Sequence, residues 1–190
     1  AFQEIDYRRM FGAMSKWTAQ IDRVDRIPEY LSHAFHIATS GRPGPVVLAL
    51  PEDMLVSEAD VADAPRYKTV YSYPGLAQLE QLRESLNAAQ RPFVLLGGSG
   101  WTSDACGAIQ AFAEAANVPV GCAFRRQDLF DNTHANYAGD VGIGINPKLA
   151  QRIKDADLVI SIGCRLDEMT TSGYTLFDVP RPKQKFVHVH

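Results

Sequence analysis

One apolar run with the glycine-rich turn after it constrains the fold of this chain more than any other stretch. Residues 93–96, Phe-Val-Leu-Leu, predict a short strand buried on both faces. Residues 102–104, Thr-Ser-Asp, offer N-cap side chains for a helix that runs to about Asn117. Backbone N–H groups and the helix dipole converge where such a strand meets such a helix, so the turn between them suits a phosphate or a similar anion. That turn consists of Gly97, Gly98, Ser99 and Gly100.

The glycine turn is not a complete dinucleotide-binding fingerprint. It lacks the full G-x-G-x-x-G spacing, and no P-loop lysine follows it. Ser99 stands between glycines as a nucleophilic serine does, but its surroundings are not G-x-S-x-G. We therefore expect the Ser99 hydroxyl to donate to a phosphate or to the backbone. A tight strand-to-helix turn that binds no ligand stays as the alternative.

Composition bounds the class of protein. The 190 residues are 46% hydrophobic and 22% charged, which is typical of a globular protein. A net charge of -3 gives no broad basic surface for nucleic acid, and no apolar run reaches the roughly 20 residues that span a bilayer. Three widely spaced cysteines and the absence of a signal peptide favour a reducing, cytoplasmic location. The first residue is Ala1, so we expect the chain to be a piece of a longer protein.

The first part of the chain predicts the end of one α/β domain. Residues 1–24 lack a clean period and predict loops and short helical turns. Apolar residues from Ile27 to Ala38 recur at helical spacing, and residues 46–50, Val-Val-Leu-Ala-Leu, predict a buried strand that stops at Pro51. The polar, acidic residues 57–74 predict an extended linker.

The second part alternates helices and strands. Leucines at helical spacing predict a helix from Leu76 to Leu86, and further strands are expected at residues 119–124, 158–163 and 186–190. Residues 125–145 are expected to form a long loop, and a short helix is expected to start at residues 146–147, Asn-Pro. The predicted fold class is α/β, a Rossmann-like parallel sheet with helices on both faces.

Charged residues gather at the predicted carboxyl ends of the strands, where open parallel sheets bind ligands. Arg125, Arg126 and Arg165 could hold phosphates. Asp140 and Asp167 could accept ribose hydroxyls. The alternative is that these arginines pair with nearby carboxylates in surface ion networks.

Histidines give no metal site in the sequence. His33 and His36 lie one helical turn apart without a carboxylate at ligand spacing, which indicates a solvated helix face. His188 and His190 share one side of a strand, which is more typical of edge-strand histidines than of metal ligands. We expect neither a metal site nor a self-sufficient catalytic centre in these residues.

Two stretches are the most distinctive: residues 38–46, Ala-Thr-Ser-Gly-Arg-Pro-Gly-Pro-Val, and residues 50–53, Leu-Pro-Glu-Asp. With them, the whole chain resembles thiamine-diphosphate-dependent enzymes of the acetolactate synthase group. Residues 91–100, 136–139 and 157–167 are similar to the central domain of the same group. The resemblance implies that residues 1–56 end a pyrimidine-binding domain, that 57–74 link two domains, and that 75–190 form a central Rossmann-like domain truncated at its end.

The resemblance also implies an activity and its cofactors. Such enzymes decarboxylate or ligate a 2-oxo acid with thiamine diphosphate and Mg²⁺ and assemble as dimers or tetramers. Phe2 and Gln3 match residues beside the cofactor and substrate, whereas the activating glutamate and the metal motif are expected outside this chain, so the fragment alone is expected to be inactive. The segment of residues 124–128 departs from the family's pattern, which leaves FAD, ADP or an empty cleft open. The residues that match positions lining that cleft are Gly97, Gly98, Ser99, Arg165 and Asp167. Gly100 of the glycine turn and Arg125 complete the candidate cofactor-binding residues.

The sequence leaves two alternative functions open. In one, the central domain is a regulatory module that binds a nucleotide; in the other, it is a spacer that has lost its ligand.

Overall fold

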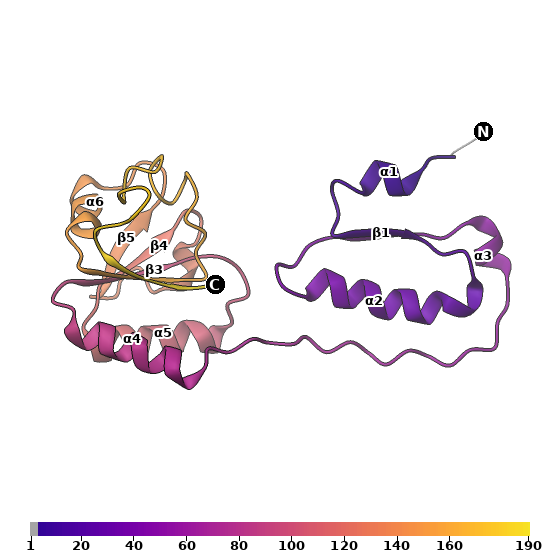
Figure 1. The fold of residues 1–190 in the computed structure, drawn as a ribbon, viewed down its shortest axis with the longest axis horizontal. Helices are drawn as coiled ribbons and strands as arrows, with labels where there is room; N and C mark the ends of the chain where they lie inside the picture. Colours follow the sequence, from indigo (N-terminus) through magenta and orange to yellow (C-terminus); the bar gives the residue numbers. More distant parts are fainter. Residues whose placement is uncertain (1–3) are drawn as a thin grey trace. The chain divides into compact units, whose positions relative to one another are not determined.

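The computed structural model describes residues 4–190, and the chain divides into two compact units, Ala1–Tyr73 and Pro74–His190 (Figure 1). The predicted residues Phe2 and Gln3 lie outside the described residues. Residues 57–75 contain no helix or strand.

The first unit is a parallel βαβ motif. Strand β1 (Trp17–Gln20) pairs in parallel with β2 (Val46–Ala49), and helix α2 (Ile27–Thr39) connects them. The 3₁₀ turn η1 (Val24–Arg26) precedes α2, and Pro28 lies in its first turn, where its missing N–H costs nothing.

The prediction of only loops and short helical turns over residues 1–24 was wrong for strand β1, whereas the five-residue helix α1 (Tyr7–Phe11) agrees with it. Helix α3 (Glu52–Val56) follows β2. Strand β1 has only four residues and one buried side chain, so its sequence carries no strong period of two. Strand β2 is present as predicted, but its side chains are half-buried rather than buried.

The second unit confirms the predicted α/β, Rossmann-like parallel sheet. Five parallel strands lie in the order β5-β4-β3-β6-β7, which corresponds to the first five strands of the 3-2-1-4-5-6 order of a dinucleotide-binding fold. Its elements in chain order are α4 (Leu76–Ala88), β3 (Pro92–Leu96), α5 (Ser103–Ala116), β4 (Val120–Ala123), η2 (Gln127–Leu129), β5 (Tyr137–Val141), α6 (Pro147–Lys154), β6 (Leu158–Ile162) and β7 (Lys185–Val189).

The sheet is covered on both faces. Helices α4 and α5 lie on one face, and α6 with the segment after β6 lies on the other (Figure 1). Alternate residues of β3 supply the two cores: Val94 and Leu96 face α5, and Phe93 and Leu95 face α6. Because β3 is buried on both sides, it anchors the turn that follows it.

Helix caps follow the sequence closely in this unit. The Thr102 hydroxyl accepts from the Ala105 N–H at 3.2 Å and begins α5, as predicted. Asn117 ends that helix in a left-handed conformation with φ 46°. The Asn146 side chain caps α6, with Pro147 in its first turn.

The prediction of one long loop over residues 125–145 was wrong. The structure places η2 and the edge strand β5 within it. Tyr137, Gly139 and Asp140 pair with β4 through an irregular register, and only Val141 of this strand is buried. A half-buried strand with glycine inside it lacks the apolar run that identified the other strands.

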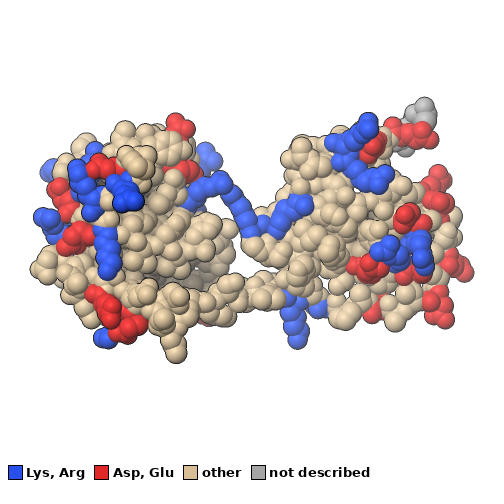
Figure 2. Space-filling view, viewed as in Figure 1, with Lys and Arg blue, Asp and Glu red and all other residues tan. Residues whose placement is uncertain are grey.

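Across residues 4–190, none of the helices has both the length and the apolar character required to cross a bilayer. Acidic and basic side chains are interspersed on the face of each unit that Figure 2 shows.

Candidate functional site

The strand order reverses between β3 and β6, and the carboxyl ends of these two strands define the candidate site. Two glycine turns meet there. A Cβ atom on Gly98 would overlap the carbonyl oxygen of Gly163, and one on Gly163 would lie 2.7 Å from the carbonyl oxygen of Gly97. Gly98 and Gly163 both have positive φ, at 74° and 65°. Only glycine allows this close backbone approach.

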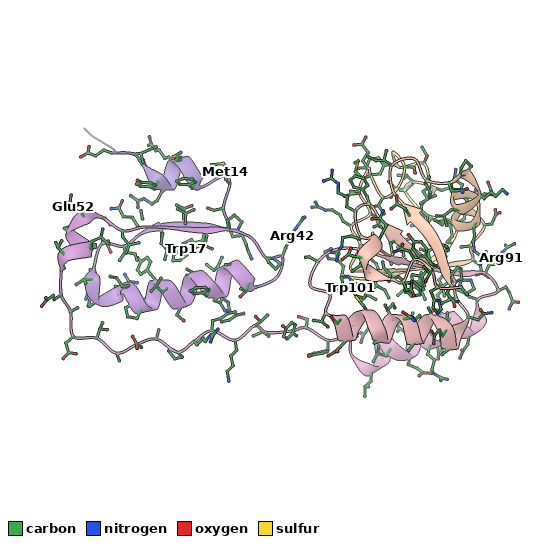
Figure 3. The ribbon with its side chains drawn as sticks, turned by 180° about the vertical axis from the view of Figure 1, so that it is seen from behind. Met14, Trp17, Arg42, Glu52, Arg91 and Trp101 are labelled. Atoms are coloured by element: carbon green, nitrogen blue, oxygen red, sulfur yellow. The ribbon has the colours of Figure 1, made fainter. Side chains whose placement is uncertain are left out.

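Trp101 lies at this reversal point. Its indole N–H donates to the Gly97 carbonyl oxygen at 2.8 Å, and its ring is half-buried. The labelled side chains of Trp101 and Arg91 lie at opposite ends of the second unit, because Arg91 precedes β3 and Trp101 follows it (Figure 3). The indole therefore marks the carboxyl edge of the sheet.

The start of α5 retains free backbone donors. Thr102 accepts from the N–H groups of Ala105 and Cys106 through its hydroxyl and its carbonyl, respectively. Within residues 4–190, the N–H groups of Ser103 and Asp104 have no recorded partner. These two donors and the helix dipole favour an anion, whereas the Asp104 carboxylate opposes one. Ser99 and Gly100 are exposed and are not locked into the core.

The end of β4 carries two arginines in different situations. Arg126 is held by Asp128 through two hydrogen bonds, Nε to Oδ1 at 3.0 Å and a terminal nitrogen to Oδ2 at 3.1 Å. Arg125 lies over the ring of Phe124, with 5.0 Å between the guanidinium carbon and the ring centroid. Among the described residues, Arg125 makes no recorded ion pair. The alternative that these arginines pair with nearby carboxylates therefore holds for Arg126, whereas the guanidinium of Arg125 stays free to bind a ligand.

Asp140 lies on β5 beside the end of β4 and is already hydrogen-bonded. Gln127 donates to its Oδ1 at 2.7 Å. Burial raises the pKa of the Asp140 carboxyl, although the Gln127 hydrogen bond opposes that rise. Burial, with a smaller contribution from Asp128 and Asp140, raises the pKa of Cys122 to about 12. Asp140 thus already accepts one hydrogen bond through Oδ1, and its role as an acceptor of ribose hydroxyls stays a prediction.

Beyond β6, the predicted site residues Arg165 and Asp167 differ in their exposure and in their hydrogen bonds. Arg165 is exposed, whereas Asp167 is half-buried and caps a turn, because its Oδ1 accepts from the Thr170 N–H at 3.0 Å. Its carbonyl also accepts from Thr171. The Nε2 atom of His188 lies 2.8 Å from the Cys164 carbonyl oxygen and fixes the start of this segment to β7. Asp167 therefore acts as a structural cap in this structure.

The structure thus brings together the backbone of the predicted glycine turn and the ends of β4 and β6. The space for a Cβ on Gly97 is closed by Ala123 and Cys164, each at 3.0 Å. Sequence reasoning assigned no role to Gly163 or to the indole of Trp101. The sequence signal for Gly163 was its place at the end of the apolar run of β6. The signal for Trp101 was its place directly after the glycine turn.

The first unit holds an open groove of about 660 Å³ between α2 and the segment around residues 61–67. His33 lies edge-on to Trp17 and His36 edge-on to Tyr67, each at 4.6 Å between ring centroids. Residues 4–190 contain no cluster of three histidine, cysteine or carboxylate side chains able to hold a metal ion.

Comparison with known proteins decides the family. Residues 79–190 match the family model described as "Thiamine pyrophosphate enzyme, central domain", which is more than half of the chain. The chain belongs to the thiamine pyrophosphate enzyme family. The residues that match this central-domain model lie within the second unit.

Sequence relatives in the thiamine pyrophosphate enzyme family extend the match to the first unit. The chain is 32% identical over 193 residues to the acetolactate synthase large subunit of Corynebacterium glutamicum, covering 99% of this chain and 30% of that protein. It is 31% identical over 198 residues to a probable acetolactate synthase large subunit of Methanocaldococcus jannaschii, covering 100% and 33%. The chain therefore spans about a third of the length of the curated relatives it matches.

A solved structure supports the fold. Benzoylformate decarboxylase from Polynucleobacter necessarius superposes with a TM-score of 0.70 at 23% identity, covering 92% of this chain and 32% of that one. At this identity the likeness concerns the fold alone.

Proposed function

We propose that this chain is part of a thiamine-diphosphate-dependent enzyme that decarboxylates or ligates a 2-oxo acid in the manner of an acetolactate synthase. The observation that carries the proposal is sequence likeness to acetolactate synthase large subunits over 99–100% of the chain. That likeness runs through both units, so it does not depend on the widespread Rossmann-like fold.

The second unit would bind a nucleotide such as FAD or ADP at the carboxyl edge of its sheet. Within the glycine turn, a Cβ on Gly100 would meet nothing within 4 Å, the first turn of α5 offers two N–H donors, and Arg125 and Arg165 lie at the ends of the neighbouring strands. A bound ADP would stabilise the folded unit and would take no part in the reaction. Of the predicted cleft residues, Asp167 is the least suited, because its side chain already caps a turn.

Thiamine diphosphate and Mg²⁺ would be held largely by other parts of the enzyme. The ligands of Mg²⁺ would come from elsewhere in the protein, as the resemblance to acetolactate synthases implies. The 190 residues alone would be inactive, and the enzyme would work in the cytoplasm as a homo-oligomer. Exposed apolar residues of the first unit support a covered surface in the assembly: Met14 is 64% exposed and Phe35 is 64% exposed.

A ligand-free spacer is the second candidate, and one observation favours it. The Trp101 indole and the Gly98–Gly163 contact occupy the point at which a ligand would enter between β3 and β6. In this alternative the second unit would only separate the catalytic domains.

Absorption and melting measurements distinguish these functions. A yellow protein, or a rise in melting temperature with FAD, is expected if the site takes a flavin; a rise with ADP or coenzyme A alone indicates a nucleotide without redox chemistry. No shift with any of them would contradict nucleotide binding and favour the spacer. The enzymatic proposal is tested separately, by measuring carbon dioxide release from 2-oxo acids by a longer protein that contains this chain. Failure to release carbon dioxide or ligate any 2-oxo acid in the presence of thiamine diphosphate and Mg²⁺ would contradict it.

A further inference from the structure

We draw no further inference here: the strongest candidate, the open groove of about 660 Å³ between α2 and the segment around residues 61–67 in the first unit, carries none, because nothing in the described residues 4–190 shows what would occupy it.

Discussion

The Trp101 indole N–H donates to the Gly97 carbonyl oxygen at 2.8 Å, directly where β3 ends and the strand order of the sheet reverses. A single aromatic side chain thus closes the turn on which the proposed nucleotide site depends. A nucleotide bound at this edge, as proposed, would lie near the indole. Trp101 would then be both a structural residue and an intrinsic reporter of the site.

Replacing the indole by a phenyl ring isolates its hydrogen bond. Trp101→Phe keeps an aromatic ring but leaves the Gly97 carbonyl without this donor, so we expect the free energy of unfolding to fall by about 0.5–1.5 kcal/mol. Denaturant titration followed by circular dichroism measures the change. An unchanged midpoint would show that the hydrogen bond adds no net stability.

Glycine substitutions test the close backbone contact between the two turns. Gly98→Ala places a Cβ in a left-handed conformation and against the Gly163 carbonyl, and we expect a loss of at least about 2 kcal/mol in the free energy of unfolding. Gly107 lies inside α5, where a Cβ meets nothing within 4 Å. Gly107→Ala is therefore the matched control, with an expected gain of roughly 0.5–1 kcal/mol. Equal effects of the two substitutions would contradict the contact.

Asp157 should stabilise the second unit in a pH-dependent way. Its two carboxylate oxygens accept the N–H groups of Gln90 and Arg91 at 2.7 and 2.9 Å and fix the start of β3 to the start of β6. Burial acts to raise its pKa, but the hydrogen bonds from the Gln90, Arg91 and Asp157 backbone N–H groups, together with the charge of Arg91, outweigh burial, and the pKa is lowered. We expect Asp157→Ala to cost about 1–3 kcal/mol at neutral pH, and Asp157→Asn to cost less.

The sign of this pH dependence follows from the lowered pKa. The contribution of Asp157 is complete above the ordinary aspartate pKa of about 3.9 and is lost as the pH falls through the lower folded-state value. The difference in unfolding free energy between wild type and Asp157→Ala should therefore shrink only below about pH 4. A difference that shrinks on raising the pH instead would contradict the assigned hydrogen bonds.

The cysteines should differ in reactivity. Burial raises the pKa of Cys122 to about 12 and that of Cys164 to about 11, whereas Cys106 is half-buried. Because the thiolate is the nucleophile, an alkylating reagent near pH 8 should modify Cys106 first and leave the other two until the chain unfolds. Mass spectrometry of the modified peptides measures the order. Modification of Cys164 in the folded chain before Cys106 would contradict the packing of the second core.

Much of the second unit could be predicted from local sequence. The buried strands β3 and β6 are continuous apolar runs, and the N-cap residues Thr102 and Asn146 indicate where α5 and α6 begin. Strand β5 was missed because it lies at the sheet edge with mostly half-buried side chains. Its existence depends on pairing with β4, which local patterns do not reveal.

The candidate site was only partly predictable. The glycine turn and Arg125 were identified from their types and spacing, and the structure places them at adjacent strand ends. The contact between Gly98 and Gly163 joins two turns far apart in the sequence, so no local signal specified it. The cap that Asp167 provides was not predicted, because the turn that it caps lacks any helix signal of its own, and its role toward a nucleotide stays a prediction.

Nucleotide binding beside Trp101 is tested most directly by its fluorescence. The chain has two tryptophans, so a Trp17→Phe background leaves Trp101 as the sole source of tryptophan emission. Titration with ADP and, separately, with coenzyme A, with the binding heat measured in parallel, should give a saturable change in emission at the same midpoint as the heat for the nucleotide that binds. Heat without a change in emission would place the nucleotide elsewhere on the chain, and the absence of both would contradict nucleotide binding at the carboxyl edge of the sheet.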